Sequence, residues 1–266
     1  MMHINDGPLE SLNQNNRYDL NESLTLTLGD DNDSNPYTDH PLVTTYLDTN
    51  NLAFLMNGNN KTIYASLNIR SLMSNHEQLS SLLNDLVRKN VNITAVALQE
   101  VWAVPYPDLV NIPGFNLILN TRSCSRGGGV GFYIKDNFDY KILNDLSPFF
   151  EKEFESLTIE ISTPGKKTIL SNVYRSPFPS PNQTASSQMD LFINRLDSHL
   201  HNLFQLNQAS FVFLDSNINL LKLPNNQTSL DYLETIHSNG YLQIISKATR
   251  IAGDSFSLID HILCKN

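Results

Sequence analysis

Residues 211–219 read Phe-Val-Phe-Leu-Asp-Ser-Asn-Ile-Asn, a short apolar run that ends in the carboxylate of Asp215 and the amide of Asn217. Such a run is typical of a buried strand. In an extended chain, residues two apart point to the same side, so Asp215 and Asn217 share one side. A carboxylate beside a phosphate can take a proton from water, and a neighbouring amide can orient that water or a phosphoryl oxygen. The alternative interpretation is an ordinary Asx turn.

Four other apolar runs of the chain end in the same way. They are Ile63–Leu67 before Asn68, Ile93–Leu98 before Gln99 and Glu100, Ile169–Val173 before Tyr174, and Ser257–Ile259 before Asp260. Strand ends are where a buried sheet presents side chains to a cleft. Each ending alone is more often a turn or a cap, but five of them together predict one shared site.

Glu100 is the candidate metal ligand. A hard cation such as Mg²⁺ takes one or two protein carboxylates and keeps several waters, so one well-placed glutamate is chemically sufficient. The amide oxygen of Asn68 can support such an ion, or the residue can simply cap a turn. The hydroxyl of Tyr174 can bond a phosphate oxygen, although a tyrosine at a strand end is also typical of a core residue with a solvated tip.

Residues 126–134, Arg-Gly-Gly-Gly-Val-Gly-Phe-Tyr-Ile, contain a glycine cluster. They lack the lysine of the GxxxxGK[ST] phosphate loop and precede a strand rather than a helix. We therefore expect these glycines to allow close packing of a strand against a neighbouring backbone. The seven histidines show no HExxH or other metal spacing, and no serine lies in a GxSxG elbow.

The first 60 residues carry most of the net negative charge of the chain. The 266-residue chain has a formal net charge of −9, and residues 1–60 hold nine acidic residues and one arginine. Residues 61–266 are therefore nearly neutral. A neutral body neither demands nor excludes a nucleic-acid partner, because local patches steer binding more than totals do.

The sequence shows no signal for membrane insertion or secretion. No apolar run approaches the roughly 20 residues of a membrane helix, and the first residues have neither a basic n-region nor an apolar h-region. Cys124 and Cys264 form no CxxC or Cys/His pattern, which indicates two free thiols in a reducing compartment. We expect an intracellular protein, nuclear or cytoplasmic, that is not secreted and binds no membrane.

Composition divides the chain at residue 60. Residues 1–60 are rich in Asn, Asp, Ser and Thr, which predicts a mostly disordered acidic leader. Within it we expect a transient strand over Leu24–Leu28 and a linker over Asn51–Asn60. Residues 61–266 form the expected folded domain.

The domain alternates strand and helix patterns. Periodicity predicts strands over 62–67, 93–98, 115–119, 130–134, 157–161, 168–174, 210–214 and 257–264, and helices over 75–89, 188–206 and 229–238. Ser74 and Glu77 have the spacing of a capping box, and Thr163–Lys166 has a hairpin composition. Hairpins mixed with helical crossovers favour an α/β sandwich of two sheets with flanking helices over a doubly wound parallel sheet.

Taken in order, these stretches resemble the endonuclease/exonuclease/phosphatase family. The nearest resemblance is to the apurinic-like endonuclease domain of non-LTR retrotransposons of the jockey and CR1-like group. It is carried by Leu67-Asn-Ile-Arg-Ser-Leu72, Ala97-Leu-Gln-Glu-Val-Trp102, residues 126–134, Asn172-Val-Tyr-Arg-Ser-Pro177, Phe213-Leu-Asp-Ser-Asn-Ile-Asn-Leu220, Lys247-Ala-Thr-Arg250 and Ser257-Leu-Ile-Asp-His-Ile262. Each motif is weak singly, but seven in the family's order are specific.

This resemblance implies a four-layer α/β sandwich of two mixed sheets, DNase I-like, that hydrolyses phosphodiester bonds in DNA. It implies Mg²⁺, or Mn²⁺ in its place, and no organic cofactor. Glu100 would hold the metal with Asn68 nearby, and Asp215 would activate the attacking water.

The same resemblance assigns further residues to the substrate. Asn217 and Tyr174 would contact the scissile phosphate, and Asp260 would orient a histidine that also contacts it. The remaining residues assigned to the cleft are Arg70, Ser257 and Thr249.

The sequence departs from the family pattern at three points. Leu214-Asp-Ser-Asn217 stands where the family has Gly-Asp-Phe-Asn, so we expect a different loop that keeps both chemical groups. The family's histidine lies in a later Ser-Asp-His segment, whereas this sequence ends at Asn266, and His261 should point to the other face of its strand. We therefore expect missing final strands, an exposed sheet edge and weak or absent nicking.

Two other functions stay open at this point. One is a phosphoinositide or nucleotide phosphatase of the same fold, which shares the Glu and Asp-x-Asn elements. The other is a non-catalytic retrotransposon remnant. The leading hypothesis is the DNA-nicking endonuclease of a non-LTR retrotransposon in a shortened reading frame.

Overall fold

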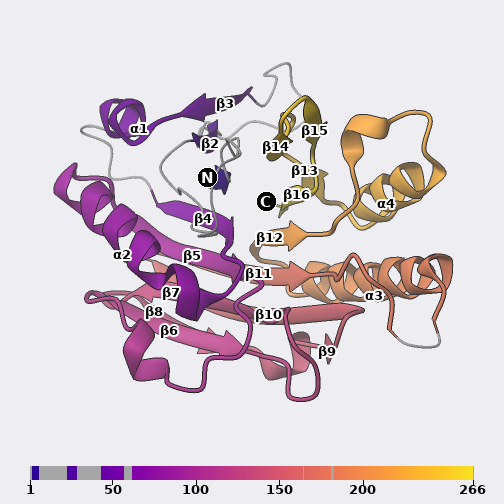
Figure 1. Cartoon of the computed structure of the whole chain (residues 1–266), viewed down its shortest axis with the longest axis horizontal. Coiled ribbons are helices and arrows are strands. Elements are labelled where there is room, and N and C mark those ends of the chain that lie inside the picture. The colour runs from indigo at the N-terminus through magenta and orange to yellow at the C-terminus, as the bar shows by residue number, and fades with distance from the viewer. Residues whose placement is uncertain are drawn as a thin grey trace.

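Two β-sheets packed face to face form the centre of the protein (Figure 1). The computed structural model describes residues 2–5, 23–28, 43–56, 62–163, 165–180 and 183–265. The first sheet has the order β3 (Val43–Leu47), β2 (Ser23–Leu28), β1 (Met2–Asn5), β4 (Ile63–Asn68), β5 (Ile93–Gln99), β7 (Val130–Lys135) and β6 (Phe115–Asn120). The pairs β1–β4 and β4–β5 are parallel and the others antiparallel.

The second sheet follows the first along the chain. Its order is β13 (Leu242–Gln243), β16 (Asp260–Lys265), β12 (Ala209–Asp215), β11 (Lys166–Tyr174), β10 (Phe154–Thr163) and β8 (Asp139–Ile142), with β9 (Phe149–Phe150) also paired to β10. The β11–β12 pair is parallel and the other neighbours are antiparallel. A separate small hairpin joins β14 (Arg250–Ala252) to β15 (Ser255–Ser257).

Helices cover the outer faces of both sheets and complete four layers (Figure 1). They are α1 (Thr49–Met56) and α2 (Leu72–Arg88) on the first sheet and α3 (Ala185–Gln205) and α4 (Gln227–Ser238) on the second, with short 3₁₀ turns η1 (Pro107–Val110), η2 (Asn144–Leu146) and η3 (Leu220–Lys222). Helix α3 buries Phe192, Leu196, Leu200 and Leu203, a three-to-four residue spacing that places them on one face. The sandwich predicted from the sequence is confirmed.

Aromatic side chains from both sheets fill the space between them. Tyr64 of β4 meets Phe211 of β12 with ring centroids 5.6 Å apart, and Phe132 of β7 meets Phe213 of β12 edge to face at 6.5 Å. All but Phe211 are almost fully buried. These contacts fix the two sheets against each other and therefore fix the relative positions of their strand ends.

Helix α2 begins one turn earlier than the capping box predicted. It starts at Leu72 after Ser71, whose side chain makes no capping hydrogen bond. Buried Asn75 instead donates from its amide to the backbone carbonyls of Ile69 (2.8 Å) and Arg70 (3.1 Å). The side chain of Asn75 thus ties the first turn to the preceding loop, which a capping rule based on Ser74 and Glu77 did not anticipate.

Part of the predicted leader is ordered and packed. The expected linker is helical over Thr49–Met56, with Leu52 and Met56 buried against α2. In β3, Tyr46 donates from its hydroxyl to the carbonyl of Ala248 (2.7 Å), and Thr44 Oγ1 accepts from the backbone N–H of Ser246 (2.9 Å). The prediction of a linker over these residues was wrong, because Leu52 and Met56 supply an apolar helix face.

The first sheet continues beyond β4. β1 runs parallel to β4, with Met2 opposite Ala65 and His3 opposite Ser66. The predicted strand over Leu24–Leu28 is confirmed as part of β2. The rest of the predicted leader, residues 1, 6–22, 29–42 and 57–60, lies outside the described residues.

Three smaller expectations concern the rest of the chain. The predicted hairpin pairs Thr163 with Lys166 at the end of β10 and β11. Cys124 and Cys264 are both free. No helix within the described ranges has the length and apolar character needed to cross a membrane.

Replacing Leu52 by alanine tests the packing of α1. Leu52 is fully buried in the cluster with α2, so we expect Leu52→Ala to lower the free energy of unfolding by about 3 kcal/mol. The measurement is urea denaturation followed by circular dichroism. Phe54→Ala is the matched control on the same helix, because Phe54 is 81% exposed, and should change stability by less than about 0.5 kcal/mol. Equal effects of both variants would contradict the packing of α1.

Candidate active site

The polar residues that follow the five apolar runs meet at one end of the sandwich, although Asp260 begins strand β16 rather than ending a strand. Tyr174 lies opposite Asp215 in the β11–β12 ladder, and Asp215 lies opposite Asp260 in the β12–β16 ladder. On the first sheet, Asn68 pairs with Gln99, and Glu100 follows directly. Parallel pairing of β4 with β5 and of β11 with β12 brings their carboxyl ends to the same edge. The sequence prediction of a shared location is therefore supported by the register.

A cleft of about 760 Å³ opens at this edge between the two sheets. Eight of the nine residues predicted from the sequence line it, namely Asn68, Arg70, Glu100, Tyr174, Asp215, Asn217, Thr249 and Asp260. Ser257 was predicted to line the cleft and does not. It pairs with Arg250 in the β14–β15 hairpin, and its carbonyl accepts the backbone N–H of Thr249 at 2.9 Å, so Ser257 supports Thr249 from behind.

Asn68 links the acidic groups of the two sheets. Its Nδ2 donates to Glu100 Oε1 (2.9 Å) and to Asp215 Oδ2 (2.7 Å). Its Oδ1 accepts the backbone N–H of Arg70 at 3.1 Å, which fixes the orientation of the amide. One amide group therefore sets the relative position of two carboxylates that lie far apart in the sequence.

Asp215 is a buried acid with a raised pKa. Its side chain is almost fully buried, and its Oδ1 has no hydrogen-bond partner. Burial raises the pKa of Asp215 well above its usual range, and the nearby carboxylates of Asp260 and Glu100 raise it further. The hydrogen bond from Asn68 opposes this shift because it stabilises the ionised form.

Asp260 is held on the opposite side by Thr249. The Thr249 hydroxyl donates to Asp260 Oδ2 at 2.7 Å and accepts the backbone N–H of Asp260 at 3.1 Å. His261 is turned away from the cleft, as its strand alternation predicted. Its Nδ1 lies 2.8 Å from the Tyr232 hydroxyl of α4 and its Nε2 lies 3.1 Å from the carbonyl of Leu258.

Tyr174 forms part of the cleft floor. It is 4% exposed, and burial raises the pKa of its hydroxyl, helped by the negative charges of Glu100 and Asp215. The hydroxyl is therefore protonated at neutral pH and can donate a hydrogen bond. The guanidinium of Arg122 lies over its ring, with Cζ 5.9 Å from the ring centroid.

A buried arginine holds the loop that carries Asn217. Arg175 donates from Nε to the carbonyl of Ser216 (2.6 Å) and from its second terminal nitrogen to the carbonyl of Asn217 (3.2 Å). In return, Asn217 Nδ2 donates to the carbonyl of Arg175 at 2.8 Å. These three bonds fix the turn at Leu214-Asp-Ser-Asn217, so Asp215 and Asn217 both reach the cleft.

Backbone strain concentrates around the cleft. Eight described residues other than glycine have a positive φ. Five of them belong to the site or its loops, namely Arg70 (44°), Ser71 (81°), Glu100 (52°), Trp102 (59°) and Asn217 (53°). L-residues rarely adopt such conformations, which persist where the surrounding structure over-determines them and which cluster at functional sites.

Two buried amides join the sheets directly beneath the cleft. Gln99 Nε2 donates to Asn172 Oδ1 (2.6 Å). Asn172 Nδ2 donates to the carbonyls of Leu98 (2.8 Å) and Gly131 (2.9 Å). Both amide side chains are at most 1% exposed. Their hydrogen bonds therefore set the spacing between the strand end that carries Glu100 and the strand end that carries Asp215.

The glycine cluster forms an arm over the first sheet's side of the cleft. Gly127, Gly128 and Gly129 all have φ near +60° to +85°. A Cβ on Gly128 would lie 2.3 Å from the Arg122 guanidinium, and a Cβ on Gly131 would lie 2.8 Å from the carbonyl of Ile118. The predicted role of these glycines in close packing is thereby supported.

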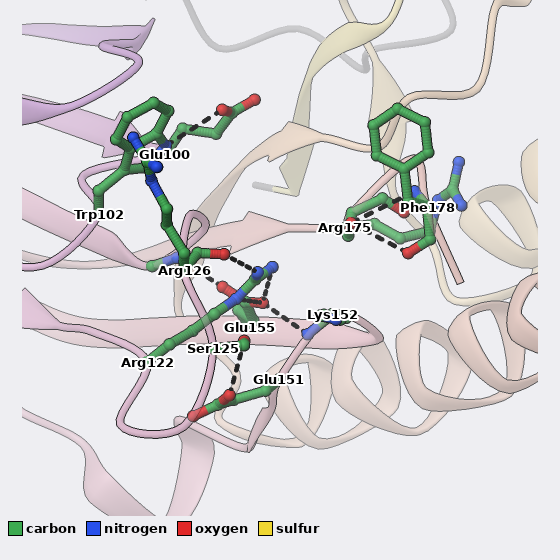
Figure 2. Close-up of polar contacts among 12 residues, drawn as sticks. Glu100, Trp102, Arg122, Ser125, Arg126, Glu151, Lys152, Glu155, Arg175 and Phe178 are labelled. Atoms are coloured by element: carbon green, nitrogen blue, oxygen red, sulfur yellow. Dashed lines mark hydrogen bonds and ion pairs between the residues drawn. The ribbon is translucent and has the colours of Figure 1, made fainter. Parts of the chain in front are cut away.

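An ion pair anchors this arm to the second sheet. Arg122 Nε donates to Glu155 Oε1 at 2.6 Å, and Glu155 Oε2 accepts the backbone N–H of Gly129 at 2.5 Å. Glu155 is fully buried, and its Oε1 also accepts the backbone N–H of Lys152 (2.7 Å). Figure 2 shows this cluster beneath Arg126 and Trp102.

Several lining residues were not found from the sequence. They are Trp102, Arg122, Arg126 and Phe178, and Arg175 supports the site from below. Trp102 and Arg175 lie inside stretches that carried the family resemblance, within two residues of Glu100 and Tyr174. This closeness in sequence could have indicated that they belong to the site. Arg122 and Phe178 lie in loops with no periodic pattern, and their proximity to the cleft depends on the tertiary fold.

The acidic side of the cleft suits a divalent cation held mainly by water. Among the described residues, no group of three or more His, Cys, Asp or Glu side chains has metal-binding spacing. The oxygen atoms at hand are those of Glu100 and the unpartnered Oδ1 of Asp215, whereas Asn68 turns its Nδ2 toward both carboxylates. Mg²⁺ needs few protein oxygens because it keeps several waters, and a cation there would offset the repulsion between Glu100 and Asp215.

Several solved structures are similar to the structure of this chain. The AP endonuclease LMAP from Leishmania major matches with a TM-score of 0.56 at 12% identity, over 76% of this chain and 78% of that one. A mannosyl-6-phosphatase from Bacteroides thetaiotaomicron matches with a TM-score of 0.51 at 13% identity, over 76% and 84%. The endonuclease domain of TRAS1, a telomere-specific non-LTR retrotransposon, gives 0.49 at 14% identity, over 77% and 84%.

These neighbours define the class of fold. The chain has the DNase I-like α/β fold of the endonuclease/exonuclease/phosphatase proteins, which include nucleases and phosphatases. No protein-family model matches the sequence, and no curated protein matches it.

Removing the buried amide of Asn172 tests the link between the sheets. Asn172→Ala removes one of the two acceptors of Gln99 Nε2 and one donor from each of two buried carbonyls, so we expect the free energy of unfolding to fall by about 2 kcal/mol. Chemical denaturation measures the change. Asn116→Ala is the control, since Asn116 is exposed on β6. A loss below about 0.5 kcal/mol for Asn172→Ala would contradict the proposed link.

Proposed function

We propose that this protein hydrolyses phosphodiester bonds in DNA with Mg²⁺, for which Mn²⁺ can substitute. The observation that carries the proposal is the Asn68 bridge, which holds Glu100 and buried Asp215 side by side at the ends of two different sheets. A buried acid with a raised pKa and an unpartnered oxygen in a cleft is characteristic of a reactive site rather than a structural one.

The cleft residues divide into two groups by chemistry. Glu100 is placed to hold the cation, and Asn68 positions Glu100 through its hydrogen bond. The cation when bound would stabilise negative charge on the phosphate and on the leaving oxygen. Asp215 is placed to accept a proton from the attacking water. The cation would favour the ionised form of Asp215, because its positive charge opposes the effects of burial and of Glu100.

The second group contacts the phosphate. Tyr174 keeps its proton at neutral pH and can donate to a phosphoryl oxygen. Asn217 Nδ2 uses one hydrogen on the carbonyl of Arg175 and has a second for the same purpose. Asp260 is bonded to Thr249, and no histidine stands among the cleft-lining residues that the structure describes. Arg70, Arg126 and Arg250 supply positive charge for the DNA backbone.

The retrotransposon assignment rests on the sequence. The Tyr-Arg-Ser-Pro stretch at 174–177 and the Ser-Leu-Ile-Asp-His-Ile stretch at 257–262 favour that branch over the phosphatases. Nicking of DNA would then supply a 3′ hydroxyl from which reverse transcription begins.

A plasmid assay tests this function. Purified protein is incubated with supercoiled plasmid and MgCl₂ at enzyme excess, and nicked circles are quantified. We expect slow nicking by the wild type. Glu100→Ala and Asp215→Ala should reduce that rate by about 10²-fold or more, and EDTA should abolish it. Glu234→Ala, at an exposed position of α4, is the matched control and should match the wild type. Nicking that is equal in all three variants would contradict the site assignment.

A further arm refines the result. A panel of small phosphoesters, including a phosphoinositide and a mononucleotide, distinguishes a phosphatase, which would act on them faster than on plasmid.

A further inference from the structure

Phe178 is an exposed aromatic side chain on a fixed backbone. It lines the cleft and is 75% exposed. Its backbone N–H donates to Ser176 Oγ (3.3 Å), and its carbonyl accepts from Ser176 Oγ (3.1 Å) and from Gln188 Nε2 (3.1 Å). Pro177 and Pro179 flank it and restrict its backbone further. The loop therefore presents the phenyl ring to solvent at a defined place.

The opposite wall carries a second fixed aromatic side chain. Trp102 donates its backbone N–H to the carbonyl of Gly128 (2.8 Å) and its indole N–H to Glu100 Oε2 (3.4 Å). The Arg126 guanidinium lies over the indole, with Cζ 5.5 Å from the ring centroid. Figure 2 shows Trp102 and Arg126 on one side of the view and Phe178 on the other.

The charges along the cleft complement a nucleic-acid strand. Arg126 and Arg250 are exposed, and Arg70 is half-buried, so their guanidinium groups can reach a ligand in the cleft. The carboxylates of Glu100, Asp215 and Asp260 gather near the strand ends instead. A small phosphoester would use the acidic centre but would leave an exposed phenyl ring and the outer arginines without a contact.

We infer that the cleft binds a nucleic-acid strand with an unpaired nucleotide, whose base stacks on Phe178 while Arg126, supported by Trp102, contacts a backbone phosphate. This inference rests on the proposed function, because it places the strand across the same acidic centre. An aromatic platform beside a basic groove is how single strands are bound without sequence preference, since every base has a stacking face. In an intact duplex the bases stack on each other and their faces are covered.

Binding without hydrolysis tests the inference. Fluorescence anisotropy measures the Kd of full-length protein, in EDTA, for a labelled 12-nucleotide single strand and for the same sequence as a blunt duplex. We expect the wild type to bind the single strand more tightly. Phe178→Ala should weaken single-strand binding by about tenfold and duplex binding by less than twofold. Phe178→Trp should restore it, because it retains an aromatic face.

Two controls complete the design. Phe54→Ala, another highly exposed phenylalanine but on α1, should leave both affinities unchanged. Arg126→Ala should reduce the slope of log Kd against log salt for the single strand by about 0.7, as expected for one lost phosphate contact. Unchanged single-strand binding by Phe178→Ala, or an equal loss for strand and duplex, would overturn the inference. Because EDTA removes the metal, these outcomes are separate from success or failure of the plasmid assay.

Discussion

The contact between the two sheets beneath the cleft is the constraint on which the site depends. Glu100 and Asn68 belong to the first sheet, whereas Tyr174, Asp215 and Asp260 belong to the second. The Gln99–Asn172 hydrogen bond joins the sheets within a few residues of these groups. A small shift of one sheet would separate Asn68 from Asp215, so the buried amides and the aromatic core between the sheets define the chemistry as well as the fold.

Two features of the site are energetically unfavourable. Three carboxylates approach one another with Asp215 buried among them, and five non-glycine residues nearby adopt a positive φ. Asn68, Thr249 and Arg175 oppose these costs through hydrogen bonds to acid groups or to loop carbonyls. Such an arrangement fixes the geometry of the site but lowers the stability of the fold. This is expected where a fold carries a reactive site.

The sequence predicted the sandwich and the meeting of the strand ends because both follow from local pattern. Buried strands are short apolar runs, and their polar last residues are visible in the chain. The helix at Thr49–Met56 escaped prediction because polar residues flank it and its apolar run is short, with only Leu52 and Met56 buried. Ser257 was misplaced because its own strand pairing turns it behind Thr249. Phe178 and Arg122 lie in loops whose course only the tertiary fold sets.

The central claim is that Glu100, positioned by Asn68, holds a divalent cation beside Asp215 where the strand ends of the two sheets meet. Isothermal titration of the full-length protein with Mn²⁺ tests it most directly, since it needs neither DNA nor turnover. The account predicts one bound ion, loss of most of that affinity in Glu100→Gln and in Asn68→Leu, and unchanged binding in Glu234→Gln, whose side chain is exposed on α4. No bound ion, or an ion whose affinity is the same in the wild type and in Glu100→Gln, would contradict the account.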